Sequence, residues 1–162
     1  TMMAVVVCAV VTMAATGDKD GDFDTVTARR VYVKNAAGDL VVRLGAINDS
    51  GNGVVMTRSA KGKDLVKLGA TVDDEGTVTT YHPNGKELVK LTSTEGGGGS
   101  VTTYQSNGKE LVDLGTSDNG GLVYVFNKTG EFIAEMSADE YGNGVVGAWN
   151  RKGKGRTLQP GP

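Results

Sequence analysis

The feature that most constrains the fold is a phrase that recurs along the chain at a nearly fixed period. Its clearest copy runs from Asn84 to Leu91 and reads NGKELVKL. The glycine of one copy is followed by the glycine of the next after 24, 23, 23, 22 and 23 residues. Such a period indicates a repeat architecture, in which each unit buries apolar surface only against its neighbours. The glycines of this column are Gly38, Gly62, Gly85, Gly108, Gly130 and Gly153.

Apolar and polar residues alternate within each repeat. Val89 and Leu91 flank the charged Lys90, and ten residues further on Val101 and Thr103 begin a second run of the same kind. Alternation with period two predicts strands with one apolar and one polar face. We expect the apolar face to be buried and the charged face to lie in solvent. The position of Leu91 is held in the other repeats by Leu44, Leu68, Leu114 and Met136.

The connections between these runs alternate between two kinds. Asn84-Gly85 and Asn107-Gly108 stand between strand-like runs, which favours a tight antiparallel hairpin because both residue types tolerate positive φ. The opposite connections are longer and acidic, as at residues 73–76 and 117–120. Thr129 replaces the asparagine before Gly130, so the turn type is left open there. The residues from Thr25 to Val33 are predicted to form the first strand.

The fold class expected from this pattern is all-β, with about five two-strand repeats over residues 25–149. A repeat offers about four inward side chains worth at most ~1.5 to 3 kcal/mol each. Ordering its backbone costs ~1 to 2 kcal/mol per residue, so a single layer needs a second layer on its apolar face. Two arrangements supply one. The favoured arrangement is an antiparallel meander that associates with other copies, and the alternative is a β-solenoid formed by one chain.

The first 16 residues carry no charge and are almost entirely apolar. As a helix they would span ~24 Å, against a hydrocarbon core of ~30 Å that takes about 20 residues. We interpret residues 1–16 as a transmembrane or signal-anchor helix that keeps the repeat domain on the extracytoplasmic side, in the periplasm or at the cell surface. Residues 17–24 then form an acidic linker, and residues 150–162 a basic C-terminal tail.

Four alternating carboxylates in the linker are weak candidates for calcium binding. An EF-hand loop that starts at Asp18 needs glycine at its sixth position and glutamate at its twelfth, where this chain has Phe23 and Arg29. A solvated linker explains the same residues. The four carboxylates are Asp18, Asp20, Asp22 and Asp24.

Composition excludes several classes of function. The chain has 17 basic and 19 acidic residues, a formal charge of −2, so no global attraction to nucleic acid is expected. Its one cysteine, Cys8, and one histidine, His82, leave no disulfide within the chain and almost no means of building a zinc site. No cofactor is therefore expected.

Catalytic chemistry finds little support. A hydrolytic triad needs a histidine beside a nucleophile, and His82 stands directly before Pro83 in an expected turn. Paired carboxylates such as Asp73 and Asp74 are explained as turn formers, because each repeat has acidic residues there. We expect a protein that is not an enzyme.

Two groups of residues are candidates for binding. An aromatic column recurs at steps of 23, 22 and 23 residues and would present rings spaced by one repeat; it favours either glycan or peptide binding, or a packing seam between sheets or chains. The basic tail favours either a cap that prevents edge pairing, or an anchor for acidic groups on a partner, glycan or lipid. These residues are Tyr81, Tyr104, Phe126 and Trp149 in the column, and Arg151, Lys152, Lys154 and Arg156 in the tail.

The phrase Gly-Lys-Glu-Leu-Val-x-Leu-Gly, followed by an acidic glycine turn and a valine-rich strand, resembles bacterial membrane-anchored β-repeat proteins of unassigned function. The resemblance covers residues 22–162, and it is looser toward the trimeric stalks of phage fibres. It implies a rod-like surface domain, a homo-oligomer in which the fibres favour a trimer, and no catalytic residues. The expected function is structural: a surface spacer, or an accessory subunit of a larger membrane or surface assembly.

Overall fold

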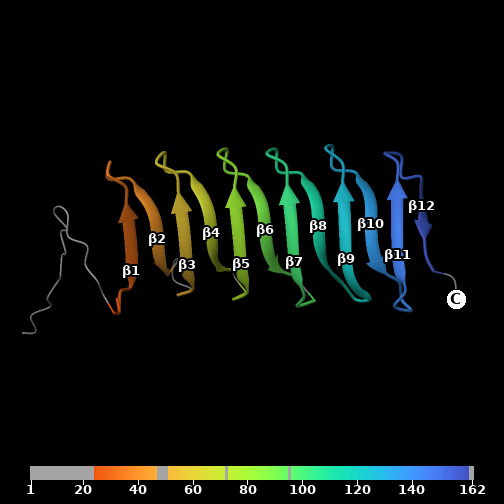
Figure 1. Cartoon of the computed structure of the whole chain (residues 1–162), viewed down its shortest axis with the longest axis horizontal. Helices are drawn as coiled ribbons and strands as arrows, with labels where there is room; N and C mark the ends of the chain where they lie inside the picture. Colours follow the sequence, from red (N-terminus) through yellow and green to blue (C-terminus); the bar gives the residue numbers. More distant parts are fainter. Residues whose placement is uncertain (1–23, 47–50, 72, 95, 161–162) are drawn as a thin grey trace, which may run out of the picture.

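The computed structural model describes residues 24–46, 51–71, 73–94 and 96–160, which form one antiparallel sheet of 12 strands (Figure 1). Each strand pairs with the next one along the chain. This order confirms the all-β meander, and the solenoid alternative is wrong because successive strands would then lie on opposite walls. The strands are β1 (Arg30–Lys34), β2 (Leu40–Ala46), β3 (Gly53–Arg58), β4 (Asp64–Ala70), β5 (Gly76–Tyr81), β6 (Glu87–Ser93), β7 (Gly99–Tyr104), β8 (Glu110–Ser117), β9 (Gly120–Phe126), β10 (Phe132–Ala138), β11 (Gly144–Trp149) and β12 (Gly155–Leu158).

The strand register aligns equivalent residues of all repeats in rows across the sheet. Leu68 of β4 pairs with Val55 of β3 and with Val78 of β5, and the pattern continues to β12. We call this row the apolar row and the side of the sheet that carries it the apolar face; the other side is the polar face. The apolar row is Val31, Leu44, Val55, Leu68, Val78, Leu91, Val101, Leu114, Val123, Met136, Val146 and Leu158.

The hairpins at the glycine column differ in detail from the prediction. The amide of Gly85 donates to the carbonyl of His82 and the amide of His82 to that of Lys86, both at 2.8 Å. Gly85 has φ of 86°, while Asn84 does not have positive φ. This is a three-residue loop in which only the glycine is left-handed, and the register shift beside it accommodates the additional residue. Gly130, at φ 89°, makes the same turn despite Thr129.

Both ends of the sheet are displaced from their predicted limits. The first strand begins at Arg30, not at Thr25, because β2 offers partners only from Leu40 to Gly45. At the other end, residues assigned to a tail form β12, in which Leu158 pairs with Val146 and Arg156 with Ala148. The sheet is therefore longer than the predicted 25–149 domain at its C-terminal end.

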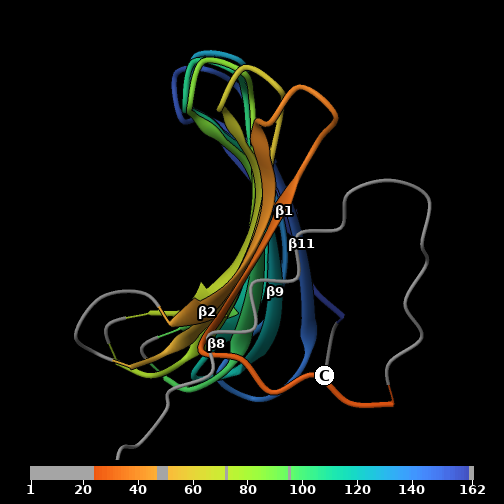
Figure 2. The same ribbon diagram turned by 90° about the vertical axis from the view of Figure 1, so that its left-hand side faces the viewer.

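Within a single chain, the polar face holds the buried side chains and the apolar face is open. The described residues form a single arched layer (Figure 2), and the apolar row lies open, with Leu68 50% and Met136 57% exposed. The buried side chains, among them Met56 and Thr79, lie on the polar face. Long side chains on that face cover their short neighbours, whereas nothing in one layer covers the short valines and leucines of the apolar face.

Two predictions fall outside the described residues. The expected membrane helix at residues 1–16 lies there, and among the residues that are described no helix is long and apolar enough to cross a membrane. Asp18, Asp20 and Asp22 also lie there. Asp24 is described and exposed, and no group of three possible metal ligands occurs within the described part of the chain.

Candidate interaction surfaces

The aromatic column lies on the polar face, where the odd-numbered strands end beside the glycine-column turns. Tyr81 pairs with Glu87 across the hairpin, and Tyr104 with Glu110. Arg58 takes the equivalent place one repeat earlier, and its Nε lies 2.7 Å from Oδ1 of Asp64. Each of these hairpins therefore places a long side chain against a carboxylate at the same level of the sheet.

Tyr81 and Tyr104 lie along their own strands. Each is hydrogen bonded to the threonine two residues earlier, Thr79 and Thr102, which are only 3% and 9% exposed. Burial raises the pKa of both phenols; the threonine bonds partly offset this rise, and the carboxylates of Glu87 and Glu110 add to it. The phenols are thus held in place and neutral at physiological pH.

The column changes character toward the C-terminus, where the rings pack on one another. Phe132 is the centre of this cluster: its ring centroid lies 6.0 Å from that of Phe126, 5.2 Å from Tyr124 and 4.8 Å from Trp149. These rings pack on one another within one sheet of one chain, which differs from the predicted seam between sheets or chains. Sequence reasoning did not assign Phe132 or Tyr124 to the site, although the entry of phenylalanine into the recurring phrase was a visible signal.

The basic residues of the predicted tail are divided between two places. Arg151, Lys152 and Lys154 belong to the turn at residues 150–154, where Oδ1 of Asn150 accepts the amides of Lys152 and Lys154. Arg151 lies 3.7 Å from Oε1 of Glu131 on the preceding turn. Arg156 instead stands in edge strand β12.

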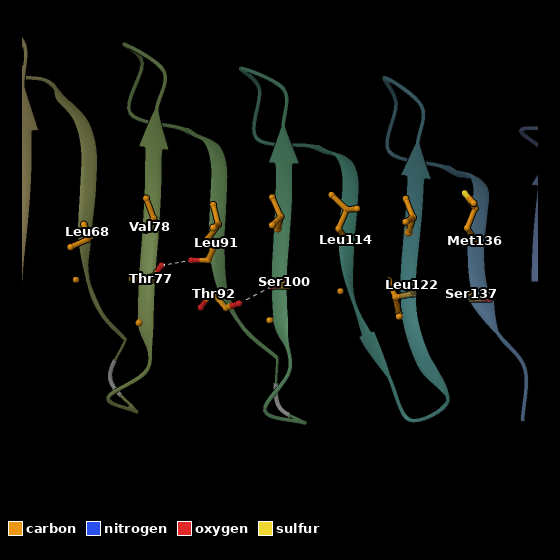
Figure 3. Close-up of a pocket in the computed structure, with 17 residues that line it drawn as sticks. Leu68, Thr77, Val78, Leu91, Thr92, Ser100, Leu114, Leu122, Met136 and Ser137 are labelled. Carbon is orange, nitrogen blue, oxygen red and sulfur yellow. Dashed lines mark hydrogen bonds between the residues drawn. The ribbon is translucent and has the colours of Figure 1, made fainter. Parts of the chain in front are cut away.

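An open pocket of about 950 Å³ follows the apolar row from β4 to β10 (Figure 3). Leu68, Leu91, Leu114 and Met136 line it together with the valines between them, and Gly76, Gly99 and Gly121 are among its other lining residues. Sequence reasoning placed the leucines and valines of this row under a second layer and did not predict an open pocket along it.

The two long edges of the sheet carry opposite charge. The turns that lead from odd-numbered to even-numbered strands form one long edge, which we call the glycine-column edge. These turns hold eight basic and two acidic residues. The described turns of the other edge hold six carboxylates and no basic residue. The basic residues are Lys61, Lys63, Lys86, Lys109, Lys128, Arg151, Lys152 and Lys154, with Asp39 and Glu131 among them; the six carboxylates are Asp73, Asp74, Glu75, Asp118, Asp139 and Glu140.

The one histidine has a structural partner. Nδ1 of His82 accepts the amide of Asn84 at 3.2 Å, and its backbone closes the turn. Asp139 is likewise engaged: its Oδ1 accepts the amides of Tyr141 and Asn143, and these bonds hold the pKa of the carboxyl below its usual value. These two titratable groups are used to build their turns.

Comparison with known proteins adds no relative. No protein-family model matches the chain, and neither does any curated protein.

Proposed function

We propose that this protein is a non-catalytic structural and interaction module: a rod-like spacer, or an accessory subunit of a larger assembly, anchored in a membrane by residues 1–16 with its sheet on the extracytoplasmic side. The observation that supports it is the strand order, in which every repeat adds one hairpin to the same sheet. Length then grows by two strand spacings, ~9.6 Å, per repeat. Twelve strands separate the two ends by ~53 Å.

The absence of enzymatic activity is part of this proposal. His82 is engaged in its turn, and the acidic turn residues lie along an edge where Asp139 and Asp74 accept hydrogen bonds from neighbouring groups. The contacts of His82 and Asp139 close their own turns, and that of Asp74 links its turn to Asn52 of the neighbouring one. None of them prepares a nucleophile or a proton donor for chemistry.

A second candidate is a module that binds a glycan or a peptide through the aromatic column. Tyr81 and Tyr104 favour it, because they are fixed against Thr79 and Thr102 and remain partly exposed on the polar face, two strands apart. Phe126 and Trp149 favour it less, since their rings pack against Phe132. No cofactor and no nucleic-acid partner is proposed.

Self-association is the interaction proposed first. The trimer rests on the resemblance to phage fibres alone, whereas the open apolar face needs only one further sheet to cover it. Other subunits of a membrane or surface complex are the alternative occupants of that face.

A deletion of residues 87–109 tests the spacer function. It removes one repeat and joins Lys86 to Glu110, which restores the phrase NGKELV at the junction. The distance from a fluorophore at the C-terminus to an acceptor on the vesicle surface is expected to fall by ~9.6 Å in the reconstituted full chain. An unchanged distance would refute the spacer. Release of the full chain from membranes by alkaline carbonate would refute the anchor.

A further inference from the structure

The apolar face is the largest feature of the molecule that the described chain leaves uncovered. Eight members of the apolar row are at least 37% exposed, and the parallel row two residues away contributes Val66 at 37%. Exposed apolar surface that is contiguous over many strands is rare on a monomer, and it marks an interaction site. These eight members are Leu44, Val55, Leu68, Leu91, Leu114, Met136, Val146 and Leu158.

The size of this face matches what a stable complex needs. Twelve strands at ~4.8 Å spacing give a length of ~53 Å, and strands of six to seven residues give a width of ~20 Å. The footprint is therefore on the order of 1,000 Å². A specific interface buries about 800 Å² on each partner, so one further sheet of the same size would suffice.

The charges of the two edges restrict how such a sheet can lie. A twofold axis parallel to the strands would place glycine-column edge over glycine-column edge and set lysine against lysine, for example Lys86 against Lys109. A twofold axis along the long direction of the sheet exchanges the edges, so that the basic edge of one copy lies over the acidic edge of the other. Complementary charge of this kind selects orientation more than it adds affinity.

We propose that the apolar face docks a second copy of this chain, around a twofold axis parallel to the long direction of the sheet. β1 of each copy then lies over β1 of its partner, the two apolar rows face one another as in a sandwich ~10 Å thick, and each basic edge meets an acidic edge. The inference rests on the self-association in the proposed function and names its surface and orientation.

The first test measures the mass of the full chain in detergent by multi-angle light scattering. The expected mass of the protein component is twice 16.8 kDa. Leu68→Glu/Met136→Glu replaces the two most exposed members of the apolar row between β2 and β11. Because these side chains are exposed in the single chain, their replacement should disturb its folding least. It is expected to raise the dissociation constant by at least ~100-fold, because each change places a carboxylate in an apolar interface. Tyr141→Glu, at a turn residue that is 81% exposed, is the matched control and should stay dimeric.

The second test removes the net charge of one edge at a time. Lys61→Glu/Lys86→Glu/Lys128→Glu leaves five basic and five acidic residues in the glycine-column turns, so that edge loses its net positive charge. Asp73→Lys/Asp118→Lys/Glu140→Lys leaves three basic and three acidic residues in the described turns of the other edge, which lose their net negative charge. Each variant alone should associate at least ~10-fold more weakly than the natural chain, and an equimolar mixture should form the mixed dimer. Low salt should strengthen that preference.

The outcomes separate the parts of the inference. A monomeric natural chain, or a dimer that Leu68→Glu/Met136→Glu leaves intact, overturns the proposed surface. Charge variants that self-associate normally and do not prefer one another overturn the proposed axis. A monomer in which the repeat deletion still shortens the distance to the membrane overturns docking while the spacer function survives.

Discussion

The indole ring of Trp149 lies over Gly147, two residues earlier on the same face of β11, and a Cβ added to Gly147 would collide with the ring. Gly147 is buried because of this contact. The same ring also occupies the space in which a Cβ of Gly155 on the neighbouring strand would lie. Trp149 therefore packs on two glycines and on Phe132, and it closes the C-terminal end of the polar face.

Gly147→Ala is expected to destabilise the fold by ~1 to 3 kcal/mol, because the new methyl group forces the ring out of its place. Urea unfolding followed by far-UV circular dichroism measures the change, because Trp149 is the one tryptophan of the chain and is itself replaced in two of the variants. Gly144→Ala, in the same strand with open space where its methyl group would lie, is the control and should change little. If Trp149→Ala does not reduce the cost of Gly147→Ala in the double variant, the ring contact is not the cause.

Replacement of turn glycines tests the hairpin geometry. Gly85→Val and Gly108→Val place a β-branched residue at φ of 86° and 88°, so each should cost at least ~1 to 2 kcal/mol. Lys86→Ala and Lys109→Ala change exposed side chains and should cost at most ~0.5 kcal/mol. Melting temperatures of the four variants give the comparison, and equal values would contradict the left-handed glycine.

Acid stability should depend on Asp139. Its pKa is lower in the fold than in the unfolded chain, because the amides of Asn143 and Tyr141 donate to the carboxylate. The resulting contribution to the free energy of unfolding is present at pH values above about 4, the pKa of the carboxyl in the unfolded chain. It is lost as pH falls through the pKa of the carboxyl in the fold. Asp139→Asn keeps an acceptor oxygen, as Asn127 and Asn150 do in equivalent turns, and should lessen the fall in unfolding midpoint with acid.

Asp139→Ala separates charge from hydrogen bonding. It removes the acceptor as well as the charge, so it should lower the unfolding midpoint at neutral pH, where Asp139→Asn changes it less. A natural chain and an Asp139→Asn variant with the same acid dependence would show that this carboxyl does not contribute to it.

The sequence determined the sheet more completely than the surface. The step between Gly85 and Gly108, with the alternation at Lys90 and Leu91, was enough to predict the strands, their pairing and the row to which each residue belongs. The turn detail was missed because Asn84-Gly85 is compatible with two loop lengths, and only the register shift distinguishes them. Strand β12 was missed because the basic residues around Arg156 indicate a solvated tail. Its backbone nevertheless pairs with the edge that β11 offers.

The predicted burial of the apolar face is not provided by one chain, for a physical reason. Alternation reports which residues share a side of a strand, but what covers that side depends on a second layer that one chain does not contain. Thr79, which pairs with Lys67 and Lys90 on the neighbouring strands, is 3% exposed, a burial that hydropathy does not reveal, while Leu68 stays open. For the candidate surfaces, periodicity was enough to place the aromatic column on one face, whereas the open pocket on the apolar face was expected to lie under a second layer.

Alkaline titration should distinguish Tyr81 and Tyr104 from an exposed tyrosine. In the fold, burial raises the pKa of both phenols above 10.0, and the nearby carboxylates raise it further. The hydrogen bonds to Thr79 and Thr102 offset only part of this rise. Such a tyrosine stabilises the fold fully at pH values below the pKa that its phenol has in the unfolded chain. That stabilisation is lost as pH rises through the pKa of the phenol in the fold. Tyrosinate absorbance should therefore show a late component, and the unfolding midpoint should fall above about pH 10.

Tyr81→Phe/Tyr104→Phe should remove the late component of the titration and lessen the alkaline fall in the unfolding midpoint. Both aromatic rings remain in this variant, so its fold at neutral pH should be retained, with the loss confined to the two hydroxyl bonds. Tyr141→Phe is the control, because Tyr141 is 81% exposed in a turn. A late component that survives the double substitution and disappears with Tyr141→Phe would show that the column tyrosines are not held against the sheet, and the polar face would then lack the fixed rings on which glycan or peptide binding depends.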